Sequence, residues 1–350
     1  MILFAVGTAL SVLFAAVAVR TTDLRPGRPS VLFVVLSVLP LTLLATLRDE
    51  VGTDWPIYLD YFQAIGAGAK EFSEPGFNLL NRVVYFFSQD FHVVTFLVAA
   101  AICLLSYAAI YRQSVIVPMS ILMLVLTGQY FNSMNQLRQA LAMAIFLWSF
   151  RFVRERKPLP YFLAMAVAIS MHQSAALYLP LYFLYGLRAN PRVHIVVLSG
   201  CLVFSPVLGK ALALIIAHTK YGWYFNSVYN DNNFYLVGFV FTLVVLALYL
   251  YYLHRVPRED REFDFMVNLQ LMAVVVLLFT SFIPQVQRVS ECFMALTCLA
   301  VPRLILREED RARRVLLYVG VVALFGAKLL YDVYVNGWFS VIPYQTFLSQ

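Results

Sequence analysis

The sequence predicts an all-α polytopic integral membrane protein with about 12 transmembrane helices. Of its 350 residues, 61% are hydrophobic and 13% are charged, whereas an ordinary soluble domain carries about 25% charged residues. The mean hydropathy is +0.77, and apolar runs of about 15 to 25 residues recur along the chain. No repeat or separate soluble domain interrupts this pattern, so residues 1–350 are expected to form a single transmembrane domain.

The expected spans follow the apolar runs. The first run has neither a basic n-region nor a clear cleavage site, so we expect a retained span and not a signal peptide. A short amphipathic segment from Phe77 to Ser88 is expected to lie at the membrane interface. The spans are predicted at 2–19, 30–47, 92–110, 115–131, 138–152, 159–172, 173–187, 194–215, 234–253, 266–283, 289–306 and 315–334.

The orientation follows from the basic residues, because Lys and Arg concentrate in cytoplasmic loops. One set of alternate loops, with its flanks, holds 18 of the 26 basic residues. These loops are 20–29, 111–114, 153–158, 186–193, 254–265 and 303–314. With them inside and an even number of spans, both termini lie outside. Residues 159–187 fit this scheme as a hairpin, and a single long tilted helix is the alternative.

The two largest polar segments then fall on the outer side. One is the 48–90 loop with the interfacial helix, and the other is the 216–233 loop, rich in Asn and aromatic residues. These extracytoplasmic loops are expected to form a site that faces away from the cytoplasm. The net charge of +7 reflects topology, so no nucleic-acid partner is predicted.

A polar cluster opens the most informative apolar run, Met134 to Phe150. Asn135, Arg138 and Gln139 are three and four residues apart, so one continuous helix would place them on one face. A guanidinium at membrane depth needs an anion or a wet cavity. The alternative is an Arg138 side chain that snorkels to the headgroups.

Two further clusters lie in the first outer loop. On a helix that starts after Gly52, Asp54, Tyr58 and Tyr61 share one face. A simple N-cap at Asp54 is the alternative. Glu74, followed by Pro and Gly, begins the amphipathic segment, where an ordinary turn is the alternative.

Two later clusters also fall on the outer side. His172 is followed by Gln and Ser in an otherwise apolar stretch, where polar groups must meet water or a partner. A packed histidine is the alternative. Gln285, Arg288 and Glu291 are spaced by three residues near the outer end of a span, and an internal Arg288–Glu291 pair is the alternative. The histidines are scattered and no nucleotide-binding motif is present, so neither a metal nor another cofactor is predicted.

These clusters, taken in order, resemble the EpsG family. The resemblance rests on residues 48–58, 74–77, 135–142 and 172–182, with a looser late element at Arg288, Cys292 and Phe293. It covers most of residues 48–295. The family comprises multi-spanning polymerases of bacterial exopolysaccharide, capsule and O-antigen repeat units, counterparts of the Wzy polymerases.

The resemblance implies a GT-C-like glycosyltransferase in the bacterial inner membrane, with its active site facing the periplasm or exterior. The donor would be an oligosaccharide on undecaprenyl diphosphate, and the acceptor would be a sugar hydroxyl of another lipid-linked unit. Besides these substrates and the lipid bilayer, a chain-length regulator and a flippase are candidate partners. A lipid-linked oligosaccharide transporter or flippase, and a glycan ligase, remain rival functions.

The candidate residues divide by the chemistry they offer. Fixed positive charge for the diphosphate would come from Arg138, Arg288 and Arg48. The base for the acceptor hydroxyl would be Asp54 or His172, with Glu74 behind them. The substrate-binding candidates are Asn135, Gln139, Trp55, Tyr58 and Gln285. The later loop offers Tyr221, Trp223, Tyr224, Tyr229 and Asn230 as an extended sugar surface, with a packing role as the alternative.

Overall fold

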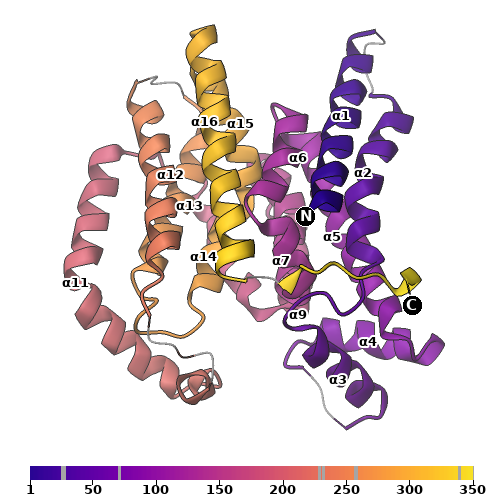
Figure 1. The fold of residues 1–350 in the computed structure, drawn as a ribbon. Coiled ribbons are helices and arrows are strands. Elements are labelled where there is room, and N and C mark those ends of the chain that lie inside the picture. The colour runs from indigo at the N-terminus through magenta and orange to yellow at the C-terminus, as the bar shows by residue number, and fades with distance from the viewer. Residues whose placement is uncertain are drawn as a thin grey trace. The chain divides into compact units, whose positions relative to one another are not determined.

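The structure is a computed structural model that describes residues 1–24, 29–69, 72–227, 230, 233–255, 259–337 and 340–349. The described chain is helical (Figure 1), and an isolated antiparallel bridge between Arg48 and Thr346 is its one β-type contact. The predicted all-α class is therefore confirmed.

Six of the described helices are long and apolar enough to cross a membrane, which supports a multi-pass membrane protein. They are Ile2–Thr21, Phe91–Gln113, Pro191–Ala217, Leu236–Arg255, Gln287–Arg307 and Arg311–Val335. Three more apolar helices are shorter: Val31–Thr46, Val117–Leu126 and Pro158–Met171. The predicted number of about 12 full spans is therefore supported only in part. Helices near most of the remaining predicted spans are too short or too polar to count by length and composition.

The described chain divides into two compact units. The first unit contains Met1–Tyr182, Thr297–Ile305 and Asp310–Gln350. The second contains Phe183–Leu296 and Leu306–Glu309.

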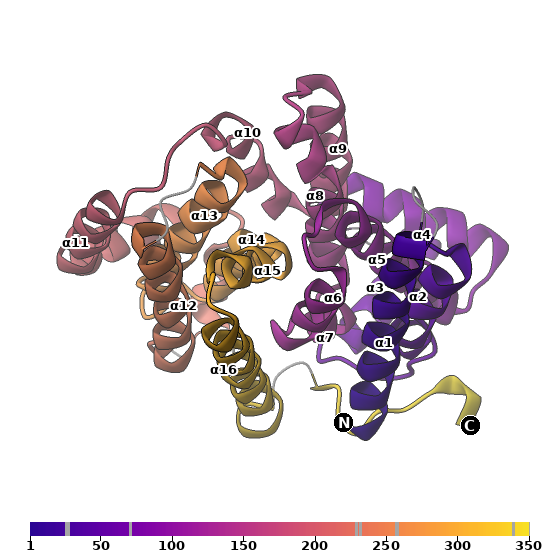
Figure 2. The ribbon, with the colours of Figure 1, turned by 90° about the horizontal axis from the view of Figure 1, so that it is seen from above.

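A set of packed apolar helices forms the first unit. α1 (Ile2–Leu24) packs on α2 (Val31–Thr46), and α2 packs on α5 (Phe91–Gln113), as Figures 1 and 2 show. α5 also packs on α8 (Leu137–Arg154), and α1 packs on α6 (Val117–Leu126). α16 (Arg311–Leu330) lies against α6 and continues into a π-helical turn.

Two short helices connect α2 to α5 and lie crosswise to them in Figure 1. They are α3 (Trp55–Gly66) and α4 (Pro75–Phe87). Each has proline in its first turn, where the missing N–H removes no intrahelical hydrogen bond. α4 buries Phe77 and Val84 and exposes Phe86 and Phe87, so the predicted amphipathic helix is confirmed. Its position at a membrane interface stays a prediction.

The helix expected through Asn135 and Arg138 is interrupted, so that prediction was wrong. α7 (Gln129–Asn135) ends and α8 begins at Gln136, whose φ of −95° and ψ of 63° are not helical. The break separates Asn135 from Arg138, so the two side chains do not share the face of one helix. Asn135 instead contacts the 52–54 loop, and Arg138 lies in the first turn of α8.

The segment 159–187 begins as the predicted hairpin. α9 (Pro158–Met171) ends at His172, and the 3-10 helix Gln173–Tyr178 turns back along α9. The Tyr161 hydroxyl donates to the Tyr178 carbonyl at 2.6 Å, which fixes the reversal. A single long helix is therefore excluded. The returning limb is a 3-10 helix followed by the short α10 (Leu181–Leu184), not a regular α-helical span.

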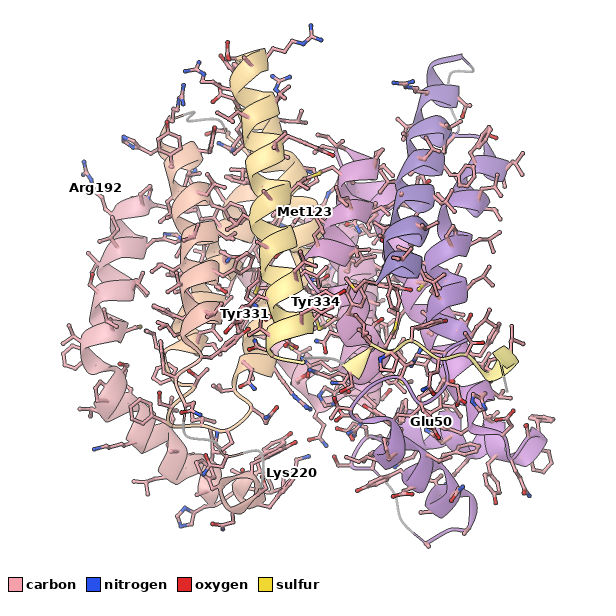
Figure 3. The ribbon with its side chains drawn as sticks, viewed as in Figure 1. Glu50, Met123, Arg192, Lys220, Tyr331 and Tyr334 are labelled. Atoms are coloured by element: carbon pink, nitrogen blue, oxygen red, sulfur yellow. The ribbon has the colours of Figure 1, made fainter. Side chains whose placement is uncertain are left out.

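The second unit contains α11 (Pro191–Ala217), α12 (Leu236–Arg255), α13 (Arg261–Leu277) and α14 (Gln287–Phe293). α15 (Thr297–Arg307) begins in the first unit and ends in the second. Figure 3 shows Arg192 in the first turn of α11 and Lys220 beyond its other end. Most of the apolar side chains of α11 are exposed, as expected for a helix that faces lipid.

Candidate functional site

A buried carboxylate, Glu74, joins two of the predicted site residues in the first unit. Its Oε2 atom accepts a hydrogen bond from Arg138 Nη1 at 2.6 Å, and its Oε1 atom lies 3.4 Å from His172 Nδ1. The Glu74 side chain is only 4% exposed, whereas that of Arg138 is 22% exposed. The start of α4, the first turn of α8 and the end of α9 therefore meet at one charged cluster.

The electrostatics of this cluster keep Glu74 ionised. Burial by itself would raise the pKa of Glu74, but the His172 ring and the Arg138 guanidinium outweigh it and lower the pKa to about 2. A carboxylate with so low a pKa is a weak base. Its evident capacity is to hold the arginine and the histidine in place.

Aromatic rings hold the other side of the Arg138 guanidinium. The guanidinium carbon lies 4.0 Å from the Phe72 ring centroid and 5.7 Å from that of Tyr58. Phe72 stacks on Tyr61 at 3.9 Å and exchanges two hydrogen bonds with the Asn78 side chain. The guanidinium is therefore fixed by a carboxylate and by aromatic surfaces. Phe72 was missed from the sequence, because no local pattern points to it.

Arg48 occupies a second, fully buried position in the same unit. Its Nη1 atom donates to the Ala45 carbonyl at the end of α2, and its guanidinium carbon lies 5.8 Å from the Trp55 ring centroid. Nε and Nη2 have no hydrogen-bond partner within the described ranges. Burial lowers the pKa of Arg48 to about 10, so it remains cationic at neutral pH. Trp55 and Tyr58, one turn apart on α3, contact Arg48 and Arg138 respectively. Both rings are buried.

The 52–54 loop is pressed against the end of α7. The Asn135 Oδ1 atom accepts from the Asp54 backbone N–H at 2.8 Å. Gly52 has a φ of +111°, and a Cβ atom there would lie 2.6 Å from the Met134 carbonyl oxygen. Asp54 precedes α3 but makes no side-chain cap hydrogen bond, so the capping alternative is not supported. Its side chain is half-buried.

A histidine that the sequence did not single out ties this loop to α5. His92 Nε2 lies 2.7 Å from Asp49 Oδ1, and His92 Nδ1 lies 2.8 Å from Asp90 Oδ1. The His92 ring donates both hydrogen bonds only when both of its nitrogens carry protons. The spacing of Asp90 and His92 at the start of α5 could have predicted their contact from the sequence. The contact of His92 with Asp49 could not have been predicted, because the two residues are 43 positions apart.

Residues 340–349, which we call the C-terminal strap, are the second feature missed. The strap pairs with the loop that contains Arg48 through the Arg48–Thr346 bridge and an Asp49 N–H to Gln345 carbonyl bond of 3.0 Å. Figure 3 shows Glu50 in this loop beside the yellow strap. The sequence of the strap carries no periodic pattern that would predict this contact.

The remaining candidates lie on α8 and in the second unit. Gln139, in the first turn of α8, is buried. Gln285 and Arg288 belong to the second unit, where the Arg288 N–H donates to the Gln285 carbonyl at 3.1 Å. The aromatic loop of that unit stacks Trp223 on Tyr224 with centroids 4.0 Å apart. Tyr229 lies outside the described residues.

The fold and this site define a helical, multi-pass membrane protein whose first unit buries an arginine, a glutamate and a histidine together at helix ends. The chain belongs to the EpsG family, whose model matches residues 31–346. The resemblance is therefore confirmed, and the match extends beyond residues 48–295 to include most of the strap. The family is associated with exopolysaccharide synthesis. Among curated proteins and among solved structures, none matches the chain.

Proposed function

We propose that this protein is a polysaccharide polymerase that joins undecaprenyl-diphosphate-linked oligosaccharide repeat units. The reaction would take place at the outer face of the bacterial inner membrane, on a GT-C-like scaffold, in the synthesis of capsule, exopolysaccharide or O-antigen. EpsG membership supports the exopolysaccharide context. The observation that carries the proposal is the Arg138 side chain, which is 22% exposed while Glu74 and Phe72 hold its guanidinium in place.

In the proposed reaction, a hydroxyl oxygen of the acceptor sugar attacks the anomeric carbon of the donor. The bond from that carbon to the diphosphate oxygen breaks, and undecaprenyl diphosphate leaves with the bonding electron pair. The hydroxyl proton passes to a base of the protein. Negative charge grows on the leaving diphosphate, and fixed positive charge aimed at it lowers the barrier.

The residues divide into two roles in this proposal. Arg138 faces the diphosphate with Arg48 of the same unit as a further cationic group, because a guanidinium matches phosphate oxygens in pairs. Arg288, in the second unit, stays a candidate for the same role. Asp54 or His172 takes the proton. The low pKa of Glu74 supports a positioning role for this carboxylate and argues against its use as the base.

A transporter or flippase for the same lipid-linked unit is the main rival. Transport of a diphosphate would favour charged side chains along a path through the membrane. Within the described helices of the first unit, Lys328 and Asp332 of the last span pair with each other. In the second unit Lys210 is exposed on α11. This distribution favours a transferase over a transporter. A glycan ligase shares the transferase chemistry and differs only in its acceptor.

Purified protein in liposomes, given only undecaprenyl-diphosphate-linked repeat units, tests the proposal. A ladder of longer glycans, sized on a gel or by mass spectrometry, is expected without added nucleotide. Movement of labelled substrate between leaflets with no ladder would instead establish a transporter. Transfer of the glycan only to an added, unrelated acceptor would establish a ligase.

A further inference from the structure

The C-terminal strap covers the loop that contains Arg48. The Gly52 N–H donates to the Ser340 carbonyl at 3.2 Å, and the Thr53 and Ser340 hydroxyl oxygens are 3.0 Å apart. The Tyr344 hydroxyl donates to the Leu44 carbonyl at 2.9 Å. Together with the Arg48–Thr346 bridge, these contacts seat the strap along residues 44–53.

Hydrogen bonds to residues 44–53 are the main contacts that hold the strap in place. Val341 is its one fully buried apolar side chain among residues 340–348, whereas Ile342 and Leu348 are exposed. Phe347 contacts the His92 ring with centroids 5.1 Å apart. Segments with few buried apolar contacts open at lower free energy than the core, so the strap can detach while the helices stay folded.

Arg48, whose backbone pairs with the strap at Thr346, is a buried cation whose charge is not neutralised. It makes no ion pair within the part of the chain that the structure describes. Its neighbour in sequence, Asp49, pairs with His92. A buried guanidinium without a counter-charge is strongly disfavoured, and the contact with Trp55 offsets this only in part.

The geometry of the two unpartnered Arg48 nitrogens indicates which kind of ligand they could bind. Nε and Nη2 share one edge of the guanidinium plane, and this edge matches two oxygens of a phosphate group side by side. The remaining nitrogen, Nη1, is already used by the Ala45 carbonyl. Arg48 is thus oriented by the end of α2, with its Nε–Nη2 edge unpartnered.

We propose that the strap is the movable roof of an oxyanion site centred on Arg48, and that its opening admits the diphosphate of the lipid-linked donor. The identity of this oxyanion rests on the proposed function. Closure of the strap buries Arg48 between turnovers, and strap opening gives the donor diphosphate access to the Nε–Nη2 edge.

The test locks the strap with the double substitution Thr53→Cys and Ser340→Cys, whose side chains already face each other. Inorganic pyrophosphate binding is measured by calorimetry on the full chain in detergent, before and after reduction. The oxidised protein is expected to bind at least tenfold more weakly than the reduced protein. Each single cysteine variant is the matched control and should show no response to reductant. Equal affinity in both redox states of the double variant overturns the proposal.

A second variant assigns the site to Arg48. Arg48→Gln is expected to remove the redox-dependent difference in pyrophosphate affinity and to raise the melting temperature, because a buried unpaired charge is lost. An unchanged redox response in this background overturns the assignment. Competition then distinguishes the source of the ligand: undecaprenyl diphosphate should displace pyrophosphate, whereas equal displacement by phosphatidylglycerol would contradict a donor site.

The glycan ladder separates this inference from the proposed function. A ladder that forms equally with the strap locked and released contradicts the strap alone. Strap-dependent pyrophosphate binding at Arg48 without any ladder, even from wild-type protein, contradicts the polymerase function and leaves the gated oxyanion site standing.

Discussion

Glu74 Oε2 and Arg138 Nη1 are 2.6 Å apart, and this contact joins the start of α4 to the first turn of α8 across 64 residues of sequence. The pair is mostly buried, so its geometry is protected from water and salt. Buried pairs of this kind add little net stability, but the loss of one partner is costly. The pair therefore serves chiefly to fix where the guanidinium points.

Arg138→Lys is expected to lower polymerisation by about 10- to 100-fold although it keeps the charge, because an ammonium cannot reproduce a planar fork held by Glu74 and Phe72. Initial rates of ladder formation check this. Arg82→Lys, at an exposed position on α4, is the matched control and should retain wild-type rates. Near-normal polymerisation by the Arg138 variant would remove Arg138 from the site.

The low pKa of Glu74 predicts a specific dependence of stability on pH. Its folded-state pKa, about 2, lies below the ordinary value of 4.5. The ionised carboxylate therefore contributes stability that is complete above about pH 4.5 and is lost as the pH falls through 2.

Glu74→Gln should accordingly unfold at a lower temperature than wild type at pH 7, with the difference shrinking as the pH approaches 2. Melting curves in detergent at several pH values check this expectation. Asp60→Asn, which alters an exposed carboxylate on α3, is the control and should follow wild type. A difference between Glu74→Gln and wild type that stays constant with pH would contradict the assignment.

The two candidates for the base make opposite predictions. If Asp54 takes the proton, Asp54→Asn lowers turnover by about 10²- to 10⁴-fold, whereas His172→Gln has a smaller effect. The melting temperature and pyrophosphate affinity of Asp54→Asn should stay close to wild type, because the hydrogen bond to Asn135 comes from the Asp54 backbone N–H, which the substitution keeps. Wild-type turnover by Asp54→Asn would transfer the role to His172.

Gly52→Ala should be destabilising because of the positive φ at Gly52 and because of a steric clash of the new Cβ atom. The corresponding substitution at Gly68 measures the first effect alone. Gly52 and Gly68 both have positive φ values, of +111° and +71°, but only at Gly52 would a Cβ atom meet another residue, the Met134 carbonyl at 2.6 Å. Gly68→Ala should cost about 1 kcal/mol through its backbone conformation alone. Gly52→Ala should lower the melting temperature further and reduce polymerisation. Equal losses in the two variants would mean that the 52–54 loop tolerates displacement.

Helix positions in this chain were largely predictable, because long apolar runs require internally hydrogen-bonded backbone. Most predicted spans have a helix close to the expected bounds, including α5 and α9. The break at Gln136 was not predictable, since glutamine is a good helix former and the neighbouring contact of Asn135 with the 52–54 loop is long-range in sequence. The 3-10 helix after His172 was also missed, because apolar composition does not distinguish a 3-10 helix from an α-helix.

The residues of the candidate site could be predicted from the sequence, but the contacts between them could not. Glu74, Arg138 and His172 were all singled out, because charges beside apolar runs are unusual. Their contacts are long-range in sequence, so nothing local indicated that Glu74 would join the other two. His92 and the strap were missed because their partners lie on distant segments.

The strap has a consequence for how the protein is made. Tyr344 and the Leu44 carbonyl that it holds are 300 residues apart. At a synthesis rate of about 5–20 residues per second, the strap emerges roughly 15–60 s after the loop that it completes. A nascent chain therefore carries the loop that contains Arg48 and Gly52 before the strap can bond to either residue. The loop reaches its final arrangement only after the later helices have been made, so a partly synthesised chain does not present a finished site.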